Sequence, residues 1–322
     1  MNILEVENLT KKYGNFTAVN NISFQIAQGE IFGFLGPNGS GKTTTINMLT
    51  GLAKITSGAA RLLGLDYSCE IKKAQQIIGI VPDESNLYEE LDGFENLCFC
   101  ASLYGMDKRM REEKARQLLN EFDLASAGSK PFKSYSKGMK RKLTIAAGII
   151  HEPRILFLDE PTTGIDVASA RRIRQLIKNL NKSGATVFLT THYIEEAEHL
   201  CHRVAFIVNG EIIRIGTVGG LIQETQQESV VQFTLAGGAG RLQQAIKEKE
   251  LAGWTVEILS DEVIRVHSPK LINLSPYIKL FEENDLTLYE AKIIRPSLED
   301  VFVKVTGIEP EKMKGDKEGG KK

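Results

Sequence analysis

Residues 36–44 read Gly36-Pro37-Asn38-Gly39-Ser40-Gly41-Lys42-Thr43-Thr44. The stretch fits the phosphate-binding loop pattern G-x-x-x-x-G-K-[S/T] at its first, sixth, seventh and eighth positions. The apolar run from Glu30 to Leu35 before it predicts a buried strand, and residues 44–49 after it predict the start of a helix. Strand, glycine-rich loop and helix are the context that this pattern requires, so the sequence predicts an α/β fold with a phosphate site.

The loop has the chemistry of a phosphate cradle. Glycines allow backbone N–H groups to turn inward around phosphate oxygens, and the N-terminus of the following helix adds partial positive charge. We expect Lys42 to reach the β- and γ-phosphates of a nucleotide and the Thr43 hydroxyl to bind Mg²⁺. The whole stretch from Gly36 to Thr44 is therefore a candidate nucleotide-binding segment.

Two carboxylates follow a second apolar run. Residues 155–158 predict a buried parallel strand, and Asp159 and Glu160 lie at its carboxyl end, where open α/β sheets bind ligands. We expect Asp159 to hold Mg²⁺ and Glu160 to polarise the water that attacks the γ-phosphate. An acidic pair after a strand is otherwise typical of helix capping, but a phosphate loop in the same chain favours the catalytic interpretation.

A histidine follows a third such strand. Residues 186–190 predict a buried strand, and Thr191 and His192 come directly after it. Because the carboxyl ends of parallel strands meet at one edge, His192 would lie near Asp159 and Glu160 and could bind the γ-phosphate. Spacing alone leaves this role and a purely structural one equally open.

Composition narrows the class of protein. The 322 residues are enough for roughly two domains, and the net charge of −1 argues against a nucleic-acid surface. The N-terminus does not resemble a signal peptide, and no apolar run approaches the about 18 residues of a spanning helix. The spacing of Cys69, Cys98, Cys100 and Cys201 fits neither a zinc site nor a redox pair, so we expect reduced thiols in a cytosolic protein.

The order of these motifs resembles the nucleotide-binding subunit of an ATP-binding cassette (ABC) transporter, over about residues 2–218. The motifs that carry the resemblance are Lys12-Tyr13-Gly14 (aromatic loop), residues 36–44 (Walker A), Tyr135-Ser136-Lys137-Gly138-Met139 (signature), residues 155–160 (Walker B), residues 161–166 (D-loop) and His192 (switch histidine). The C-terminal Pro-Ser-Leu-Glu-Asp-Val-Phe, residues 296–302, is similar to the drug- and antibiotic-export type.

The resemblance implies a P-loop NTPase (RecA-like) core with a helical ABC subdomain at about residues 84–150. It implies ATP and Mg²⁺ as cofactors, adenine stacked on Tyr13, and a homodimer in which Ser136 and Gly138 bind the ATP of the partner subunit. It also implies a separate transmembrane permease, and hence a place in the cytoplasm on the inner face of the cell membrane. No nucleic acid is expected as a partner.

Two positions depart from the family pattern. The signature differs from the common Leu-Ser-Gly-Gly-Gln at its variable places, in a form similar to the drug-export branch. After the strand at residues 77–81 the family usually has Gln, and this chain has Asp83, a shorter side chain with a negative charge. Asp83 could still ligate Mg²⁺, or Glu84 could serve after a shift of one residue. This difference bears on the coupling of hydrolysis to transport.

The remainder of the chain predicts a second domain. The glycine-rich residues 216–220 mark the start of a domain at residues 221–308, in which residues 229–308 alternate in the order β-α-β-β-α-β of a ferredoxin-like layer. We expect a small C-terminal α+β accessory domain there, with a last helix opened by a capping box at residues 297–300. Residues 309–322 are mostly charged or glycine and predict a disordered tail.

These observations lead to one main hypothesis and two alternatives. The main one is the ATP-hydrolysing subunit of an ABC exporter that energises a separate permease. The first alternative is a soluble ABC ATPase acting on ribosomes or nucleic acid. Three features argue against it: the single cassette, the lack of long coiled coils and the net charge. The second is a weakly hydrolysing nucleotide-dependent regulator, suggested by Asp83.

Overall fold

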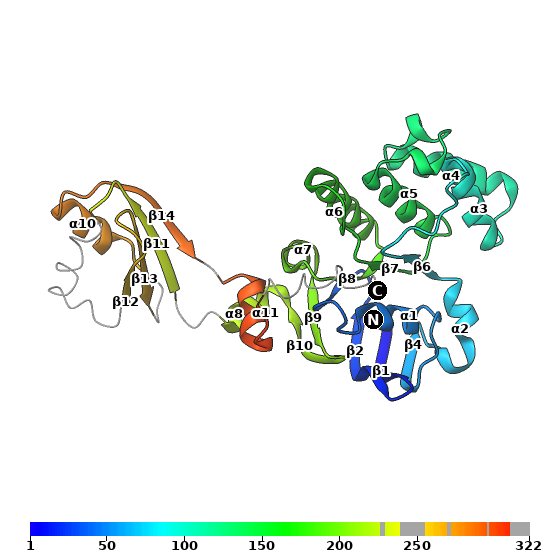
Figure 1. Ribbon diagram of the computed structural model, residues 1–322, viewed down its shortest axis with the longest axis horizontal. Helices are drawn as coiled ribbons and strands as arrows, with labels where there is room; N and C mark the ends of the chain where they lie inside the picture. The colour runs from blue at the N-terminus through cyan, green and yellow to red at the C-terminus, as the bar shows by residue number, and fades with distance from the viewer. Residues whose placement is uncertain (226–228, 239–254, 269–271, 295, 310–322) are drawn as a thin grey trace, which may run out of the picture. The chain divides into compact units, whose positions relative to one another are not determined.

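The computed structural model describes residues 1–225, 229–238, 255–268, 272–294 and 296–309 (Figure 1). The chain forms two compact units. The first comprises residues 1–218 together with the chain from Phe302 onward, and the second comprises residues 219–301. No helix within the described ranges has the length and apolar character needed to cross a membrane.

A six-stranded sheet forms the centre of the first unit. Its order is β10-β9-β3-β8-β7-β6. The strands are β3 (Ile31–Leu35), β6 (Ile78–Val81), β7 (Ile155–Asp159), β8 (Thr186–Thr191), β9 (Arg203–Val208) and β10 (Glu211–Thr217). All neighbours pair in parallel except β10, which is antiparallel to β9. The predicted α/β fold with a largely parallel sheet is confirmed.

The sheet is buried on both faces, which explains its sequence. Every residue of β3, β7 and β8 is buried, as expected for parallel strands covered by helices. Phe32, Phe34 and Phe157 each lie with their ring centroids 5.4–6.0 Å from that of Phe188. Burial of each such side chain contributes about 1.5–3 kcal/mol, so the apolar side chains of these strands stabilise the sheet. The helices α1 (Lys42–Leu49), α6 (Val167–Lys182) and α7 (Ile194–Leu200) also belong to this unit.

A second, antiparallel sheet is formed by strands that lie before and after β3 in the chain. It has the order β2-β1-β4-β5 and is made of β1 (Asn2–Tyr13), β2 (Phe16–Ala27), β4 (Ser57–Leu62) and β5 (Leu65–Asp66). The helix α2 (Tyr67–Gln75) follows it. Register shifts interrupt the pairing of β1 with β2, and with it the simple alternation of buried and exposed residues.

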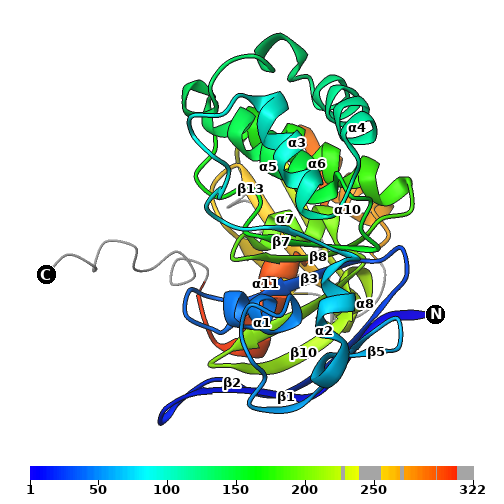
Figure 2. The same cartoon turned by 90° about the vertical axis from the view of Figure 1, so that its right-hand side faces the viewer.

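The helical region predicted at about residues 84–150 is present. It contains α3 (Gly93–Leu103), α4 (Lys108–Glu121), two 3₁₀ turns (Ala125–Ala127 and Phe132–Ser134) and α5 (Lys137–Ile149). Asp92 and Glu95 form a capping box at the start of α3, and Asp107 caps α4. Figure 2 shows α3, α4 and α5 on the opposite side of the six-stranded sheet from β1 and β2.

The second unit contains a four-stranded antiparallel sheet in the order β12-β13-β11-β14. Its elements are β11 (Ser229–Leu235), β12 (Thr255–Ile258), β13 (Val263–Ser268), α10 (Ser275–Glu283) and β14 (Leu288–Ile294). In the order of the chain the strands lie 2-3-1-4, which fits the ferredoxin-like arrangement that we expected. The helix expected at residues 242–249 and the tail from residue 310 lie outside the described residues, and the extent of an accessory domain stays a prediction.

Two helices flank the second unit along the chain. The first, α8 (Val218–Thr225), begins at the boundary between the units. The last, α11 (Leu298–Thr306), opens with the expected capping box, since the Ser297 hydroxyl and the Asp300 carboxylate bond each other's backbone N–H groups. The sequence analysis placed this helix in the C-terminal domain. In the structure its end belongs to the first unit, because Phe302 packs edge-on against Phe206 of β9 at 5.2 Å.

Candidate nucleotide-binding site

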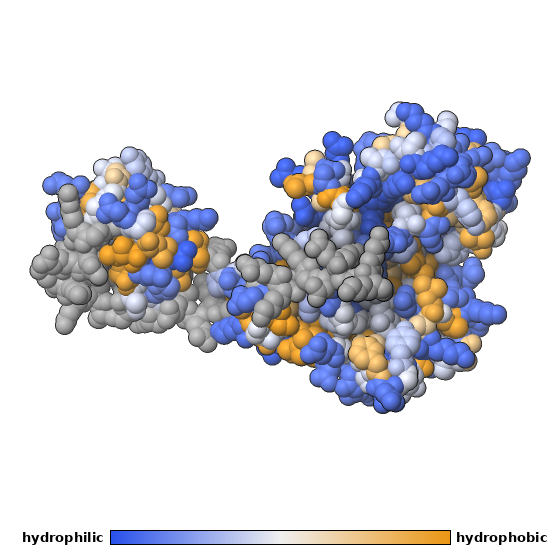
Figure 3. All heavy atoms as spheres, viewed as in Figure 1, coloured by the Kyte–Doolittle hydropathy of each residue, from blue (hydrophilic) through white to orange (hydrophobic). Residues whose placement is uncertain are grey.

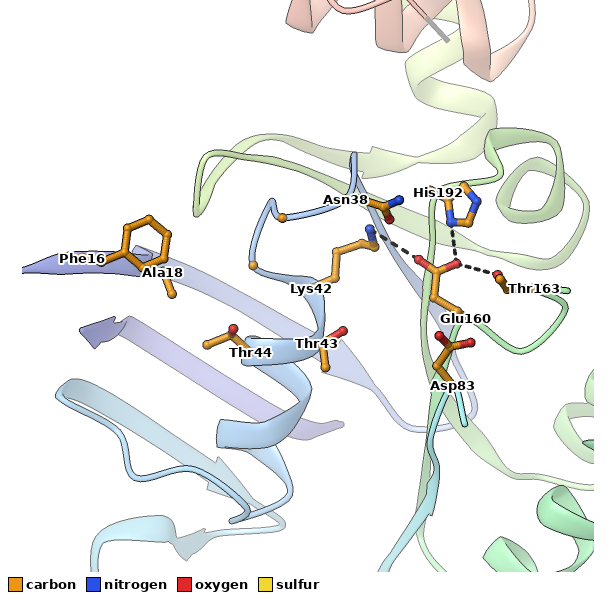
Figure 4. Close-up of a pocket in the computed structure, with 12 residues that line it drawn as sticks. Phe16, Ala18, Asn38, Lys42, Thr43, Thr44, Asp83, Glu160, Thr163 and His192 are labelled. Atoms are coloured by element: carbon orange, nitrogen blue, oxygen red, sulfur yellow. Dashed lines mark hydrogen bonds and ion pairs between the residues drawn. The ribbon is translucent and has the colours of Figure 1, made fainter. Parts of the chain in front are cut away.

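The carboxyl ends of four parallel strands bring the predicted residues together. Residues 36–44 follow β3, Asp83 follows β6, Asp159 and Glu160 end β7, and His192 follows β8. A cavity of about 360 Å³ opens there (Figure 4). Its lining residues are Phe16, Ala18, Asn38, Gly39, Gly41, Lys42, Thr43, Thr44, Asp83, Glu160, Thr163 and His192.

Two glycines of the loop have no room for a side chain. A Cβ atom at Gly36 would lie 2.1 Å from the carbonyl oxygen of Ile207. Gly41 has a φ of +103°, and a Cβ there would lie 2.6 Å from the carbonyl oxygen of Ala18. Both positions therefore require glycine, and they let the loop backbone turn tightly before α1. Gly41 is also the N-cap of α1 and no side chain caps this helix, so its first N–H groups suit an anion.

Lys42 is held at this helix start with its ammonium at the cavity. The side chain is only 6% exposed. Its Nζ donates to the carbonyl oxygens of Gly36 at 2.8 Å and Pro37 at 3.1 Å, and lies 3.4 Å from Glu160 Oε1. Burial lowers the pKa of Lys42, while the Glu160 carboxylate opposes this shift. The cation is therefore compensated within the chain and positioned for phosphate oxygens.

Glu160 is the centre of the polar network. The residue has a φ of +49°, and its side chain accepts hydrogen bonds at Oε2 from Nδ1 of His192 at 2.7 Å and from the Thr163 hydroxyl at 3.1 Å. Burial opposes ionisation of this carboxyl, but the His192 hydrogen bond and the charge on Lys42 outweigh it and hold the pKa of Glu160 below its ordinary value. Glu160 is thus an ionised base at neutral pH.

Asp159 lies deeper than Glu160. It is 5% exposed and accepts a hydrogen bond from the Thr190 hydroxyl of β8. Burial raises the pKa of Asp159, while hydrogen bonds from the Thr190 and Thr43 hydroxyls act in the opposite direction. The contact with Thr43 places two of the three expected Mg²⁺ ligands side by side.

The residues present fit Mg²⁺ when nucleotide phosphates complete the site. Within the described ranges, no three His, Cys, Asp or Glu side chains form a metal cage. Mg²⁺ typically takes one or two carboxylates and substrate phosphates in place of such a cage. Thr43 and Asp83 line the cavity and Asp159 contacts Thr43, so these oxygen donors suit the ion.

Ser136 and Gly138 do not line the chain's own cavity. Ser136 is exposed at the N-cap of α5, where its hydroxyl accepts the Met139 N–H at 3.2 Å. Gly138 is buried, and a Cβ there would lie 2.6 Å from Ser169 Oγ. This placement leaves a helix N-terminus with a hydroxyl directed to solvent.

The aromatic side of the cavity differs from the expectation. Tyr13 is 51% exposed, and its ring lies 4.7 Å from the Lys11 ammonium, but the aromatic residue in the cavity lining is Phe16. Tyr13 and Phe16 are directly paired across the β1–β2 hairpin, so both side chains project from one face of the sheet. The sequence signal for Phe16 was an aromatic residue across a Gly-Asn turn from Tyr13.

The sequence analysis missed several polar residues at the site. Thr163 bonds Glu160 from the expected D-loop, and Arg141 lies 3.7 Å from the Asp83 carboxylate. Glu196 of α7 is 1% exposed and accepts the Thr162 hydroxyl at 2.8 Å. The two consecutive threonines at residues 162 and 163 were the available sequence signal for the contact between Thr163 and Glu160. No local pattern indicates the contacts of Arg141 and Glu196.

Several known proteins are similar to this chain over most of its length. A family model described as ABC transporter matches residues 19–163. The linearmycin resistance ATP-binding protein LnrL of Bacillus subtilis is 36% identical over 309 residues, covering 95% of this chain and 98% of the relative. The daunorubicin resistance ATP-binding protein DrrA3 of Streptomyces coeruleorubidus is 34% identical, with 94% and 96% covered. The Nod factor export ATP-binding protein I of Paraburkholderia xenovorans is also 34% identical, with 95% and 97% covered.

Solved structures share the fold over about two thirds of the chain. An ATP-binding subunit of an ABC transporter has a TM-score of 0.63 at 29% identity and covers 69% of this chain and 92% of its own. A dimeric ATP-binding cassette in a post-hydrolysis state, bound to ADP and Pi, has a TM-score of 0.61 at 28% identity, with 66% and 98% covered. With the Walker residues assembled as described, the chain belongs to the ABC transporter family as one of its ATP-binding, ATP-hydrolysing proteins.

Proposed function

We propose that this chain is the ATPase subunit of an ABC exporter and energises transport through a separate membrane permease. The observation that carries the proposal is the ionised Glu160, held by His192 and Thr163 and facing Lys42 in one cavity. Relatives of nearly equal length are named for resistance to linearmycin and daunorubicin and for Nod factor export, which supports export as the direction of transport.

In this proposal the loop residues bind the nucleotide. The backbone N–H groups of residues 36–44 and the N-terminus of α1 surround the phosphates, and Lys42 moves its hydrogen bonds from loop carbonyls to phosphate oxygens. Phe16 and Tyr13 offer aromatic faces to the adenine from the same side of the β1–β2 hairpin.

Glu160 and His192 then act on the water that attacks the γ-phosphate. Glu160 polarises this water, and His192 holds the carboxylate in place and contacts the γ-phosphate. Thr43 and Asp159, with Asp83 in the cavity lining, would hold Mg²⁺. When bound, Mg²⁺ neutralises the charge that develops on the phosphoryl group.

The exposed start of α5 supports a second site in a homodimer. Ser136 and the backbone near Gly138 would bind the terminal phosphate of ATP held by a second copy of this chain. The dimeric cassette among the similar structures supports this arrangement. ATP would then be buried between two subunits, neither of which has a complete site alone.

The helical region offers a surface for the permease. Tyr88, Phe99 and Leu103 are 56%, 37% and 66% exposed, and the rings of the first two meet edge-to-face at 5.1 Å. The neighbouring Leu87 is buried in the core. Exposed aromatic and aliphatic side chains suit an amphipathic helix of a membrane partner. In this proposal the chain acts in the cytoplasm at the inner face of the membrane.

The test is recovery of the permease with a form that holds ATP. We expect Glu160→Gln to bind ATP, hydrolyse it about 10²–10⁴-fold more slowly and accumulate as a closed dimer. Affinity purification of this variant from detergent-solubilised membranes with ATP should recover a polytopic membrane protein at about one copy per subunit, identified by mass spectrometry. Lys42→Ala, treated in the same way, is the control, because we do not expect this variant to form the closed dimer.

Other results would lead to different functions. Ribosomal proteins or nucleic acid recovered in place of a membrane protein would support the soluble ATPase of the first alternative. Glu160→Gln with unchanged hydrolysis would contradict the assignment of the base, and a wild-type protein that binds ATP but barely hydrolyses it would support the regulator.

A further inference from the structure

Arg141 of α5 fastens the loop after β6. Its side chain is 7% exposed. The guanidinium donates through Nη1 to the carbonyl oxygen of Pro82 at 2.6 Å and through Nη2 to that of Asp83 at 2.6 Å. Two parallel bonds from one planar group fix both the position and the direction of this loop.

Nη2 of Arg141 also contacts the residue that follows β7. Nη2 of Arg141 donates to the carbonyl oxygen of Glu160 at 3.4 Å. Glu160 has a left-handed backbone, an uncommon conformation for a residue with a side chain, and its N–H is bonded to the carbonyl oxygen of Thr190 at 3.1 Å. Thr190 therefore holds the peptide unit before Glu160, and Arg141 holds the peptide unit after it.

Arg141 also supplies buried positive charge among carboxylates. Burial lowers the pKa of its guanidinium, while the nearby Asp83, Asp159, Glu196 and Glu160 oppose this shift. Its Nη2 lies 3.7 Å from Oδ1 of Asp83, the carboxylate that stands where the family usually has a neutral Gln. The ion pair offsets the negative charge that Asp83 brings to a phosphate site.

The position of Arg141 in the helix connects two sites. The helix α5 runs from Lys137 to Ile149 with Ser136 as its N-cap, so Arg141 lies just over one turn from the exposed helix start. A helix moves as a unit over this distance. Displacement of its N-terminus therefore shifts the guanidinium relative to Asp83 and Glu160.

We propose that Arg141 is a positioning residue for hydrolysis: it sets the backbone of Glu160 and the Asp83 loop from the helix whose N-terminus faces the partner's ATP. The proposal rests on the function proposed above for Glu160 and Ser136. Binding of the partner's phosphate at the start of α5 thereby aligns the water-polarising base of this subunit's own site.

The test compares two adjacent basic residues of α5 in the full-length chain. Arg141→Lys keeps the charge but cannot bond the three carbonyl groups in one plane, and Arg141→Gln keeps an amide donor without the charge. Lys142→Gln is the matched control, because Lys142 bonds a different carbonyl group, that of Phe122, at 2.9 Å. Steady-state ATP hydrolysis gives kcat and KM, binding of a fluorescent ATP analogue gives Kd, and hydrogen exchange reports on residues 155–165.

We expect Arg141→Lys and Arg141→Gln to lower kcat about tenfold or more, as for loss of a hydrogen bond to a charged group, with Kd for the ATP analogue within about threefold. Exchange should quicken at residues 155–165 and little elsewhere, and Lys142→Gln should match the wild type. An unchanged kcat for Arg141→Lys overturns the inference. So does a joint loss of kcat, ATP binding and solubility in both variants, because this pattern indicates a purely structural residue.

Glu160→Gln, measured in parallel, separates this inference from the proposed function. If Glu160→Gln hydrolyses ATP like the wild type, the assignment of the base fails. If Glu160→Gln is inactive while Arg141→Lys is fully active, the base stands and only the role of Arg141 fails.

Discussion

The two units of the chain differ most in where they bury charge. Among the described residues, the buried charged side chains are Glu30, Lys42, Arg141, Asp159, Glu160 and Glu196, and all lie in the first unit. The second unit buries Ser268 as its polar side chain, and its core is built from Phe233, Tyr277, Phe281 and aliphatic residues. Four of these six residues interact electrostatically with a fifth, Glu160; they are Lys42, Arg141, Asp159 and Glu196.

This difference separates stability from chemistry. Burial of a charge is costly unless it is paired, and a core of apolar side chains is usually at least as stable as a buried ion pair. We therefore attribute the buried charges near Glu160 to the ATP chemistry proposed for the first unit, whereas the second unit has an ordinary packed core. Substitutions should consequently affect catalysis in one unit and folding in the other.

The largest expected effect is on the core of the second unit. Phe233 is fully buried, with ring centroids 5.3 Å from Tyr277 and 5.1 Å from Phe281. Phe233→Ala should destabilise this unit by about 3–5 kcal/mol through lost burial and the cavity that remains. Calorimetry with and without ATP measures this, because the transition that ATP raises belongs to the first unit.

The control for this variant is Tyr289→Ala, since Tyr289 is 73% exposed on β14 of the same sheet. It should change the stability by less than about 0.5 kcal/mol. ATP hydrolysis at 25 °C should remain near that of the wild type in both variants. Loss of hydrolysis in Phe233→Ala under conditions where the first unit stays folded would break the separation between the two units.

A smaller effect is expected at the phosphate loop. Lys42→Ala removes the buried ammonium that faces Glu160 and should weaken ATP binding by about 100-fold, equivalent to roughly 2.7 kcal/mol for a lost charge-assisted hydrogen bond. Isothermal titration calorimetry gives the affinity. Lys73→Ala removes an exposed lysine paired with Glu70 and should bind ATP normally. Near-normal binding by Lys42→Ala would contradict the assignment of the phosphate loop.

The parts of the site that the sequence predicted are those in which the functional residues lie next to a recognisable strand in the chain. The loop at residues 36–44, the Asp159–Glu160 pair and His192 each follow a strand, and the parallel sheet necessarily brings strand ends to one edge. Their placement thus depends on the topology alone. The resemblance to the ABC family then indicated which chemistry this edge performs.

Residues whose role depends on packing between distant segments could not be predicted. Arg141 bonds carbonyl groups 58 and 59 residues away, and the residue type carries no sign of such partners. The strand β4 was missed for a similar reason. Its sequence, Ser-Gly-Ala-Ala-Arg-Leu, has few residues that favour strands, and its pairing with β1, such as Leu62 with Leu4, determines its conformation.

The smallest effect concerns the pH dependence of hydrolysis. The hydrogen bond from His192 and the charge on Lys42 hold the pKa of Glu160 below its ordinary value against the effect of burial. A base acts when it is deprotonated, so hydrolysis is present above this pKa and is lost as the pH falls through it. His192→Ala removes the hydrogen bond and raises the pKa of Glu160, so hydrolysis should be lost at a higher pH than in the wild type. The shift should be about one pH unit if the hydrogen bond contributes roughly 1.4 kcal/mol.

Profiles of kcat against pH measure this shift independently of any overall loss of rate. His199→Ala is the control, since His199 is 57% exposed and 3.7 Å from Glu195, away from the cavity. The stability of the folded state should depend on pH in the same direction. A carboxyl with a lowered pKa stabilises the fold above its unfolded pKa, and this contribution is lost as the pH falls through the folded pKa. If the acid limb of His192→Ala coincides with that of the wild type, the hydrogen bond does not tune Glu160. The buried charges of the first unit would then position the substrate without setting the protonation of the base.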